Sequence, residues 1–323
     1  MNILITGAAG YIGSQLLLDV PSKSGPDAHS VIIYDNMQDE RYQSLMNLPL
    51  TGRYSFHYGD VQDADELTRA AESADVIIHL AALTNAVVSF QRTEQTELVN
   101  YHGTENVVAA ALNAPRVRRV IYASTCSVYG ETHGQVNEAS PCHPESPYGR
   151  YKLAGERAVM ELGELSKGRV FGTGLRLGTV FGVSPGLRVH TVVNLFALHG
   201  ALSMPIKVFG SGEQLRPFVH VRDASSAFLF ALHHEETAGQ VYNVVGENVS
   251  VNQVLDYVRP RFPRLRVERM PGKHLNQLSY EVDGSKLRAL GWSACWTVEQ
   301  GVDEFARLCT PFSSVGQALL SGV

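Results

Sequence analysis

The chain opens with MNILITGAAGYIG, residues 1–13, in which a short apolar run is followed by glycines at three-residue intervals. This GxxGxxG pattern is typical of the turn between the first strand and first helix of dinucleotide-binding folds. Gly7 and Gly10 bring the backbone close to a pyrophosphate, and Gly13 lets the helix pack near the strand. The helix N-terminus offers amide donors to the phosphates. The stretch predicts a Rossmann fold, the alternative being an ordinary glycine-rich turn.

The rest of the first half alternates short apolar runs with helical patterns. Apolar runs predict strands at residues 2–6, 31–35, 54–58, 76–81 and 120–123. Apolar residues at three- and four-residue spacing predict helices at 63–72, 94–113 and 147–166. Alternating strands and helices form parallel βαβ units, whose sheets bind ligands at the carboxyl ends of the strands. The functional residues are therefore expected at that edge.

The pattern becomes irregular beyond residue 176, which indicates a second lobe. The predicted fold class is α/β, a Rossmann doubly wound parallel sheet with a smaller C-terminal substrate-binding lobe. We expect residues 1–176 to form the Rossmann domain and 217–245 to return to it. Residues 177–216 and 246–323 are expected to form the lobe.

The composition excludes several classes of protein. The chain has 323 residues, of which 44% are hydrophobic and 18% charged, as in globular proteins. A net charge of -5 without a basic cluster argues against a nucleic-acid partner. Four scattered cysteines form neither a disulfide framework nor a zinc site, so no metal is expected. Neither a signal peptide nor a membrane-spanning run is found, which predicts a cytoplasmic protein without a membrane partner.

Asp35 ends the second predicted strand, where a carboxylate can accept hydrogen bonds from the ribose hydroxyls of NAD. The same charge would repel the additional phosphate of NADP, so NAD is the expected cofactor. The alternative is a turn aspartate, because Asp35-Asn36 is itself a turn sequence. Asp60 and Val61 follow the third strand and are placed to reach the adenine.

Tyr148 and Lys152 lie four residues apart, on one face of the predicted helix 147–166. A lysine ammonium beside a phenol, with a cationic nicotinamide ring nearby, lowers the phenol pKa from about 10 toward neutrality. Tyr148 would then act as a general base on a substrate hydroxyl while hydride passes to the cofactor. By itself this spacing is common, and the alternative is a surface pair on a helix.

Further motifs make the combination specific. The fifth predicted strand runs into YASTCSVYG, residues 122–130, HLAA at 79–82 ends the fourth strand, and RPFVHVRD occupies 216–223. With the glycine turn and the tyrosine–lysine pair, these motifs resemble the extended short-chain dehydrogenase/reductases, the NAD-dependent epimerase/dehydratase family. The resemblance extends from Met1 to about Trp292.

The resemblance implies a tightly held NAD that takes a hydride from a hexose on a nucleoside diphosphate and usually returns it. It makes Thr125 the hydroxyl partner of Tyr148, with Ser124 as second candidate. Arg216 would grip the substrate diphosphate. The implied cofactor-binding residues are Gly7, Ala9, Gly10, Tyr11, Ile12, Gly13, Asp35, Asn36, Asp60, Val61, Leu80, Ala81, Ala82, Thr84, Asn100, Tyr148 and Lys152. The implied substrate-binding residues are Thr84, Thr125, Thr179, Arg188, Asn194, Val208 and Arg216.

The chain departs from the family patterns at two places. Dehydratases of the family carry Thr-Asp-Glu before Val-Tyr-Gly, whereas this chain has Thr125-Cys126-Ser127. A conventional 4,6-dehydratase is therefore disfavoured, as are decarboxylases that keep the glutamate. Thr179 stands where many 4-epimerases have asparagine, which predicts a remodelled sugar pocket. Cys126 is a further acid/base candidate if its pKa is lowered, the alternative being a small buried residue.

We therefore expect an NAD-dependent sugar-nucleotide epimerase that acts through a transient keto-sugar, most simply at position 4. The alternatives are a net dehydrogenase or reductase, or a non-standard dehydratase, on the same fold. A non-catalytic dinucleotide-binding sensor or scaffold is the alternative from another class. A homodimer through helices 94–113 and 147–166 is implied by the resemblance.

Overall fold

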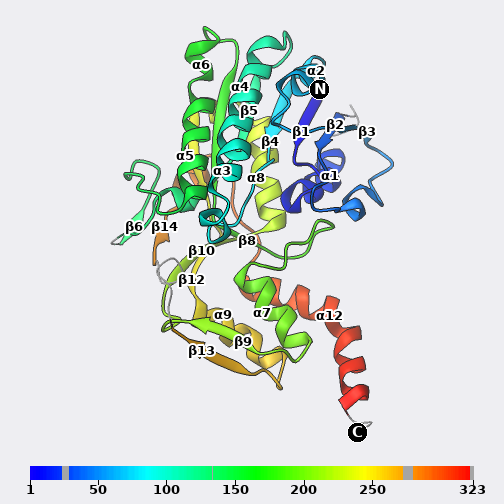
Figure 1. Cartoon of the computed structure of the whole chain (residues 1–323), viewed down its shortest axis with the longest axis vertical. Coiled ribbons are helices and arrows are strands. Elements are labelled where there is room, and N and C mark those ends of the chain that lie inside the picture. The colour runs from blue at the N-terminus through cyan, green and yellow to red at the C-terminus, as the bar shows by residue number, and fades with distance from the viewer. Residues whose placement is uncertain (24–28, 133, 272–278, 321–323) are drawn as a thin grey trace.

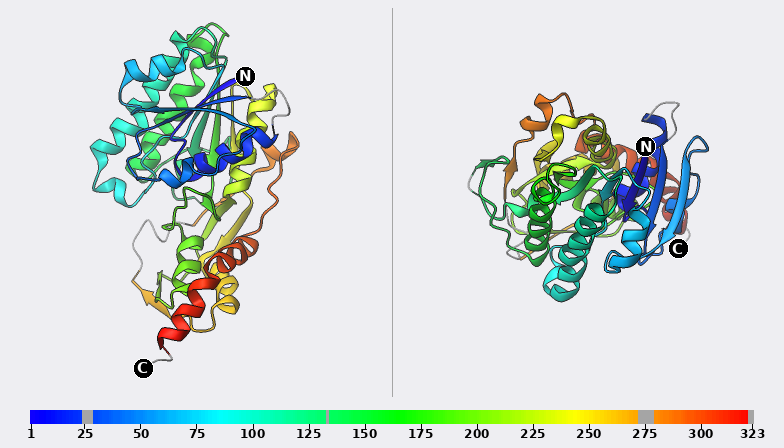
Figure 2. Two further views of the ribbon diagram at one scale, coloured as in Figure 1. Left: turned by 90° about the vertical axis from the view of Figure 1, so that its right-hand side faces the viewer. Right: turned by 90° about the horizontal axis from the view of Figure 1, so that it is seen from above.

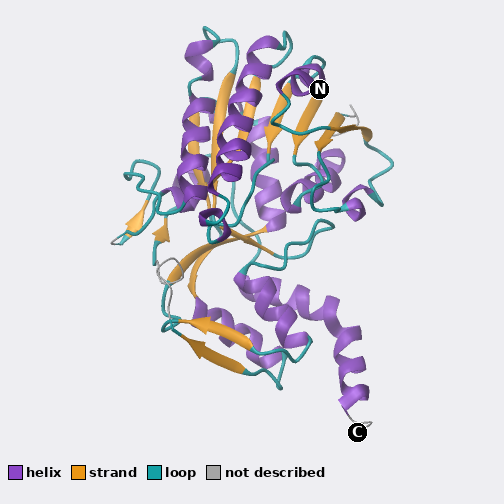
Figure 3. Ribbon diagram, in the orientation of Figure 1, coloured by secondary structure: helices purple, strands orange, loops and turns teal. Residues whose placement is uncertain are grey.

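The computed structural model describes residues 1–23, 29–132, 134–271 and 279–320, with side chains up to residue 309. A seven-stranded sheet forms its centre, with the order β11-β7-β5-β4-β1-β2-β3, and every pairing in it is parallel. The strands are β1 (Asn2–Thr6), β2 (Ser30–Asp35), β3 (Arg53–Tyr58), β4 (Val76–His79), β5 (Arg119–Thr125), β7 (Phe171–Leu177) and β11 (Gln240–Val244). The strand order reverses at β1, which pairs with both β2 and β4. The predicted doubly wound Rossmann fold is confirmed (Figures 1 and 3).

Alternate residues of β1, β2, β4 and β5 supply two separate cores. In β1, Ile3 and Ile5 pack with helices α1 and α8, whereas Leu4 packs with α2 and α4 on the opposite face. These four strands are buried on both sides because helices cover both faces of a parallel sheet, whereas the side chains of the edge strand β3 are largely exposed. The helices are α1 (Tyr11–Lys23), α2 (Ala64–Ala71), α3 (Thr93–Glu97), α4 (Gly103–Asn113), α5 (Pro147–Met160), α6 (Leu162–Leu165) and α8 (Val221–His233).

A second lobe lies below the carboxyl edge of the sheet and carries the C-terminus (Figure 2). It has its own apolar core, in which Phe196, Phe218 and Phe305 are buried. Its elements are β8 (Thr179–Phe181), α7 (Val192–Ala201), β9 (Ile206–Phe209), β10 (Leu215–His220), β12 (Glu247–Ser250), α9 (Val251–Val258), β13 (Val267–Met270) and α12 (Val298–Leu320). Strands β12, β10 and β8 form a three-stranded sheet, and β13 pairs with β9.

The residues expected to return to the Rossmann domain are divided between the two parts. Strand β11 joins the central sheet and α8 packs on it, but β10 pairs with β8 and β12 in the three-stranded sheet. Conversely, Leu287 and Trp292 lie within the expected lobe but pack into the core beside α8. The domain boundaries given above stay a prediction.

The remaining elements are short and lie at the edges of the site. Strand β6 (Gln135–Val136) pairs with β14 (Glu281–Val282), and helix α11 (Ser285–Ala289) follows. A π-helical turn, η3 (Leu98–His102), interrupts the helix that was predicted over 94–113. The other short helices are η1 (Tyr42–Leu45), η2 (Val88–Phe90), η4 (Cys126–Val128), η5 (Glu235–Thr237) and η6 (Arg259–Arg261). Among the described helices, none combines the length and the apolar character that crossing a bilayer demands.

Candidate active site

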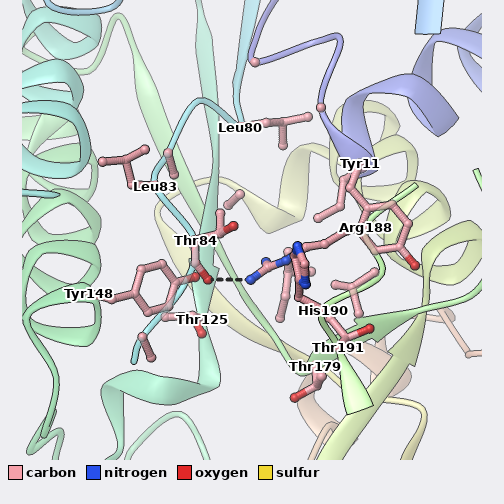
Figure 4. A pocket seen from close by; sticks show the side chains of 18 of the residues that line it. Tyr11, Leu80, Leu83, Thr84, Thr125, Tyr148, Thr179, Arg188, His190 and Thr191 are labelled. Carbon is pink, nitrogen blue, oxygen red and sulfur yellow. Dashed lines mark hydrogen bonds between the residues drawn. The ribbon is translucent and has the colours of Figure 1, made fainter. Parts of the chain in front are cut away.

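A cavity of about 610 Å³ lies between the carboxyl edge of the central sheet and the second lobe. The ends of β1, β2, β4 and β5 line one side of it, and residues from α7, β9 and β10 line the other. Figure 4 shows Tyr148 and Thr125 on the sheet side, with Arg188 and His190 reaching in from the opposite side. A volume of this order is within the range of ligand-binding clefts.

The glycine turn has no room for side chains. Gly7 has a positive φ of 69°, and a Cβ there would lie 2.6 Å from the backbone nitrogen of Ala81. A Cβ on Gly13 would lie 2.5 Å from the carbonyl oxygen of Ala8. The turn and the first residues of α1 line the cavity, so backbone amides face it at a helix N-terminus. These features fit the pyrophosphate of a dinucleotide.

Residues 182–188, which we name the junction segment, lie against this glycine turn. The Tyr11 hydroxyl donates to the Gly182 carbonyl at 2.6 Å, and the Gly186 amide donates to the Ser14 hydroxyl at 2.8 Å. A Cβ on Gly186 would lie 2.6 Å from the carbonyl oxygen of Gly10. The segment therefore joins the second lobe directly to the predicted cofactor turn.

Acidic side chains gather at the end of β2. The Asp35 carboxylate lines the cavity and accepts hydrogen bonds from the amides of Ala9, at 2.9 Å, and Met37, at 2.8 Å. A carboxylate has about four acceptor positions, so Asp35 retains acceptor capacity for ribose hydroxyls. Burial raises the pKa of Asp35, and the two amides oppose that shift. The Asn36 side chain donates to Asp60 at 2.8 Å.

Tyr148 lies in the first turn of α5, which Ser146 caps by accepting a hydrogen bond from the Gly149 amide at 3.1 Å. Thr125 ends β5, and its hydroxyl is hydrogen-bonded to the Tyr148 phenol. Both residues line the cavity (Figure 4). The structure thus brings together the predicted base and its predicted hydroxyl partner.

The electrostatics of this pair are set by burial and by a nearby arginine. Burial raises the pKa of the Tyr148 phenol, and the groups that oppose the shift are Thr125 and the Arg188 guanidinium. Lys152 also lines the cavity, but its Nζ lies 4.1 Å from the centre of the Tyr122 ring. Burial lowers the pKa of Lys152 from 10.5 to about 7. Arg188 is therefore a further cation that favours the Tyr148 phenolate, and the lowering of the Tyr148 pKa by Lys152 beside a bound nicotinamide stays a prediction.

The substrate end of the cavity is rich in cations and hydroxyl groups. Arg188 donates from Nη2 to the Thr84 carbonyl at 3.0 Å, as the dashed line in Figure 4 marks. The Arg216 guanidinium carbon lies 5.2 Å from the centre of the Tyr280 ring. The other predicted residues that line the cavity are Gly7, Ala9, Gly10, Tyr11, Ile12, Gly13, Asn36, Asp60, Val61, Leu80, Ala81, Ala82, Thr84, Thr179 and Val208.

Two predicted contacts point into the protein instead. Asn100 is fully buried, and its amide both donates to the carbonyl of Leu83 and accepts from the Leu83 amide. Asn194 is also fully buried and binds Gly182, Arg188 and the Tyr11 hydroxyl. Because internal partners occupy both amides, they support the walls of the cavity and do not line it.

Ser124 and Cys126 border the cavity, but their side chains are bonded elsewhere. The Ser124 hydroxyl donates to Glu156 at 2.5 Å, and the Cys126 thiol donates to the Arg176 carbonyl at 3.3 Å. Burial raises the pKa of Cys126, which disfavours the thiolate that acid/base chemistry would need. The geometry therefore gives no support to a chemical role for either residue.

Many residues that line the cavity were not foreseen, and three of them matter for the substrate end. Ser127, His190 and Tyr280 face the substrate end of the cavity. Tyr280 is 9% exposed and is hydrogen-bonded to Ser127 and Arg216. No motif marks Tyr280, which follows an irregular stretch. The sequence could have indicated His190, because it lies two residues beyond Arg188, which was predicted to bind the substrate.

Comparisons with known proteins by sequence and by structure lead to the same family. The chain is 30% identical over 314 residues to a trifunctional UDP-glucose 4,6-dehydratase/UDP-4-keto-6-deoxy-D-glucose 3,5-epimerase/UDP-4-keto-L-rhamnose-reductase of Arabidopsis thaliana. That match covers 93% of this chain and 46% of the relative, so the chain spans about half the length of that relative. It is 30% identical over 318 residues to the dTDP-D-glucose 4,6-dehydratase of Mus musculus, covering 93% of this chain and 86% of the mouse protein.

Among solved structures, UDP-glucuronic acid 4-epimerase from Bacillus cereus, in complex with UDP-glucuronic acid and NAD, is similar with a TM-score of 0.88. It is 25% identical, and the match covers 96% of this chain and 99% of that one. A sequence profile of the NAD dependent epimerase/dehydratase family matches residues 3–245. The predicted cofactor, NAD, agrees with the dependence of the family. The chain therefore belongs to the NAD dependent epimerase/dehydratase family.

Proposed function

We propose that the protein is an NAD-dependent epimerase of nucleoside-diphosphate sugars that inverts the sugar at C4 through a transient keto-sugar. The observation that carries the proposal is the hydrogen-bonded pair of Thr125 and Tyr148 at the wall of the cavity. That pair can hold a sugar hydroxyl and receive its proton. The glycine turn and Asp35 provide a place for the dinucleotide in the same cavity.

In this proposal bound NAD supplies a hydride acceptor that returns the hydride later. The Tyr148 phenolate removes the proton of the substrate hydroxyl as that carbon loses its hydride, and Thr125 donates a hydrogen bond to the reacting oxygen. After the keto-sugar rotates in the site, Tyr148 would return the proton to the carbonyl oxygen. A bound dinucleotide would supply the hydride to the opposite face of the same carbon. Arg216 would hold the substrate diphosphate. No net redox change results.

The acids of the cavity argue against a dehydratase. Elimination of water from a sugar needs an acid and a base near the carbons that lose it. Within the described part of the chain, the carboxylates that line the cavity are Asp35, Asp39 and Asp60, and all three lie at the glycine turn and the ends of β2 and β3. Positions 126 and 127, beside Thr125, carry a thiol and a hydroxyl. The sugar end thus lacks the carboxylic acid pair that elimination uses.

The relatives support the substrate class more firmly than the reaction. Two of them are named as 4,6-dehydratases and one as a 4-epimerase. All three are named for UDP or dTDP sugars, which supports a nucleoside-diphosphate sugar here. The absence of acids at the sugar end favours epimerisation between these two reactions.

A screen of UDP-, GDP-, dTDP- and CDP-sugars, with product stereochemistry read by NMR, tests the proposal. An epimerase yields the C4 epimer without accumulating NADH. A 4-keto-6-deoxy product would identify a dehydratase, and stoichiometric NADH a net oxidoreductase. Bound NAD without turnover of any sugar would indicate a sensor or scaffold.

Replacing Tyr148 by phenylalanine tests the assigned base. We expect kcat to fall by roughly 10²–10⁴, the usual contribution of a general acid/base, while NAD remains bound. The matched control is Tyr151→Phe on the same helix, because the Tyr151 hydroxyl donates to Glu97 at 2.9 Å and not into the cavity. Unchanged turnover in Tyr148→Phe would show that another group is the base.

We also propose a homodimer through helices α3, α4 and α5. Leu98 and Phe90 lie beside these helices and are 42% and 52% exposed, so the face retains apolar surface. Sedimentation velocity measures the assembly, and a monomer at micromolar concentration would contradict it.

A further inference from the structure

Helix α5 carries a third functional candidate on the face that holds Tyr148 and Lys152. Glu156 follows Lys152 by four residues and is 3% exposed, although a buried carboxylate is costly unless it is paired. It lies one turn further from the cavity and does not line it. Its presence directly behind the catalytic group calls for a physical explanation.

Glu156 accepts three hydrogen bonds. One oxygen accepts from the Ser124 hydroxyl at 2.5 Å and from Nε of Arg176 at 3.0 Å, and the other accepts from Nη2 of Arg176 at 2.7 Å. Arg176 and Glu156 therefore form a bidentate ion pair. Two parallel hydrogen bonds fix the relative orientation of the two side chains more firmly than a single contact does. Ser124 and Arg176 are opposite each other in β5 and β7. Glu156 therefore ties α5 to both strands.

The pair continues across the sheet. Nη1 of Arg176 donates to the Tyr129 hydroxyl at 2.9 Å, and that hydroxyl donates to Asn243 at 2.8 Å. Asn243 in turn donates to the carbonyl of Asp283 at 2.9 Å. The network thus runs from α5 through β5, β7 and β11 to the residues after β14. All its polar atoms are partnered, which makes a buried network rigid.

From this geometry we propose that Glu156 is a positioning residue that, with Arg176 and Ser124, fixes α5 against β5 and favours the protonated form of Lys152. Ser124 immediately precedes Thr125, so the hydrogen bond from Ser124 to Glu156 sets the distance between the Thr125 hydroxyl and Tyr148. The catalytic roles of Thr125 and Tyr148 rest on the function proposed above, whereas the effect on Lys152 does not.

The surroundings of Lys152 make Glu156 the decisive charge. Besides Glu156, two titratable groups lie beside Lys152, His79 from β4 and Tyr122 from β5. Burial lowers the pKa of His79 to about 3 and raises that of Tyr122 well above 10, so both are neutral at pH 7. Burial also raises the pKa of Tyr148. Glu156 is the group that opposes the burial of the Lys152 ammonium.

The test measures Lys152 directly. The chain has six lysines, so ¹³Cε signals of labelled lysine can be titrated individually, and Lys152 is identified by its loss in Lys152→Arg. In Glu156→Gln, which keeps the shape but removes the charge, we expect Lys152 to bind its proton about tenfold more weakly. The matched control is Glu161→Gln, an exposed acid at the end of the same helix, which should leave the titration unchanged.

A second variant guards against loss of folding. Glu156→Gln leaves Arg176 without its partner, and an unpaired buried charge destabilises a protein. The double variant Glu156→Gln/Arg176→Gln removes both charges and should still show a weakened Lys152, by less than Glu156→Gln alone, because no unpaired Arg176 cation remains to repel the ammonium. A Lys152 titration identical to wild type in either folded variant would overturn the proposal, whether or not a substrate is known.

The catalytic part has its own measurement. With a substrate from the screen, Ser124→Ala should lower kcat with little change in KM, because the substrate contacts remain. In Glu156→Gln the alkaline limb of the kcat profile should move to lower pH. A uniform loss at every pH would indicate a merely structural residue, and would overturn the positioning role while leaving the proposed function intact.

Discussion

At the scale of single residues, Arg188 makes two interactions at the cavity. It binds the Thr84 backbone and its charge opposes the burial of Tyr148. An arginine stays protonated at every working pH. Lys152, with a pKa of about 7, is charged in only part of the molecules near neutrality. Arg188 is therefore the more dependable source of positive charge for a phenolate.

Replacing Arg188 by glutamine should raise the pKa of Tyr148, because a cation that favours the phenolate is lost. We expect the acid limb of the kcat profile to move about one unit to higher pH and kcat near pH 7 to fall about tenfold. The measurement uses saturating substrate, so that altered binding does not enter. Arg150→Gln, an exposed change on α5, is the control. If the acid limb of the kcat profile does not move, groups other than Arg188 determine the pKa of the base.

Lys152 should make stability depend on pH. Its pKa is lower in the folded protein than in the unfolded chain, so unfolding takes up a proton between pH 7 and 10.5. The free energy of unfolding therefore rises with pH in this window through Lys152. Lys152→Met should stabilise the protein at pH 6 by on the order of 3–5 kcal/mol, and the gain should shrink towards pH 10. Urea unfolding at both pH values measures it, and a gain independent of pH would contradict the lowered pKa.

The sequence predicted which side chains matter here better than it predicted what they do. Tyr148, Thr125 and the glycine turn lie in one cavity because strand ends and helix starts share an edge. Whether a predicted side chain faces the cavity or an internal partner depends on its hydrogen bonds in the folded protein. The Cys126 thiol faces the Arg176 carbonyl, and Asn194 binds backbone from its own lobe. Arg176 lies 50 residues from Cys126, and the Tyr11 hydroxyl that Asn194 also binds lies 183 residues away, so no local pattern indicates these contacts.

At the scale of elements, the π-helical turn η3 interrupts the helix that the sequence predicted as continuous over residues 94–113. Periodicity predicted a continuous helix over 94–113, but the chain widens at Leu98–His102 before α4 begins. A π turn rotates the residues that follow it and often marks a functional region. Here it turns Asn100 inward, where the amide holds the loop after β4.

Asn100→Ala should therefore loosen that loop. The change leaves the partly buried Leu83 amide and carbonyl without these partners, at on the order of 1 kcal/mol for each group, the low end of the cost for an unpaired buried group. We expect a lower free energy of unfolding and faster hydrogen exchange of the Leu83 amide. The control Asn113→Ala removes an exposed amide at the end of α4 and should be nearly neutral. Equal stability of the two variants would contradict the bracing role.

At the scale of the whole molecule, the alternation of strands and helices predicted the central sheet, because buried parallel strands are continuous apolar runs. Strand β3 was found although its side chains are largely exposed. The three-stranded sheet of the second lobe was not foreseen. Its strands have three to six residues and come from distant segments, so no period of two develops. Pairing across such distances depends on tertiary packing.

The junction segment gives a test that involves both parts of the molecule. Gly186→Ala places a Cβ within 2.6 Å of the Gly10 carbonyl, so either the segment or the glycine turn must move. We expect less NAD to co-purify with this variant and a lower thermal midpoint without added NAD. Gly163→Ala, where the nearest atom is a Phe171 ring carbon at 3.3 Å, is the control. Full retention of NAD in Gly186→Ala would show that the contact does not affect the cofactor.

The same contact has a consequence for turnover. Because the start of α1, after the glycine turn, is hydrogen-bonded to the segment leading into the second lobe, we expect release of a dinucleotide to be coupled to movement between the lobes more strongly than exchange of the sugar is. Slow departure of one ligand and fast departure of the other turns a soluble coenzyme into a resident prosthetic group. A redox-neutral cycle can run for many rounds on such a captive molecule, and a net oxidoreductase cannot.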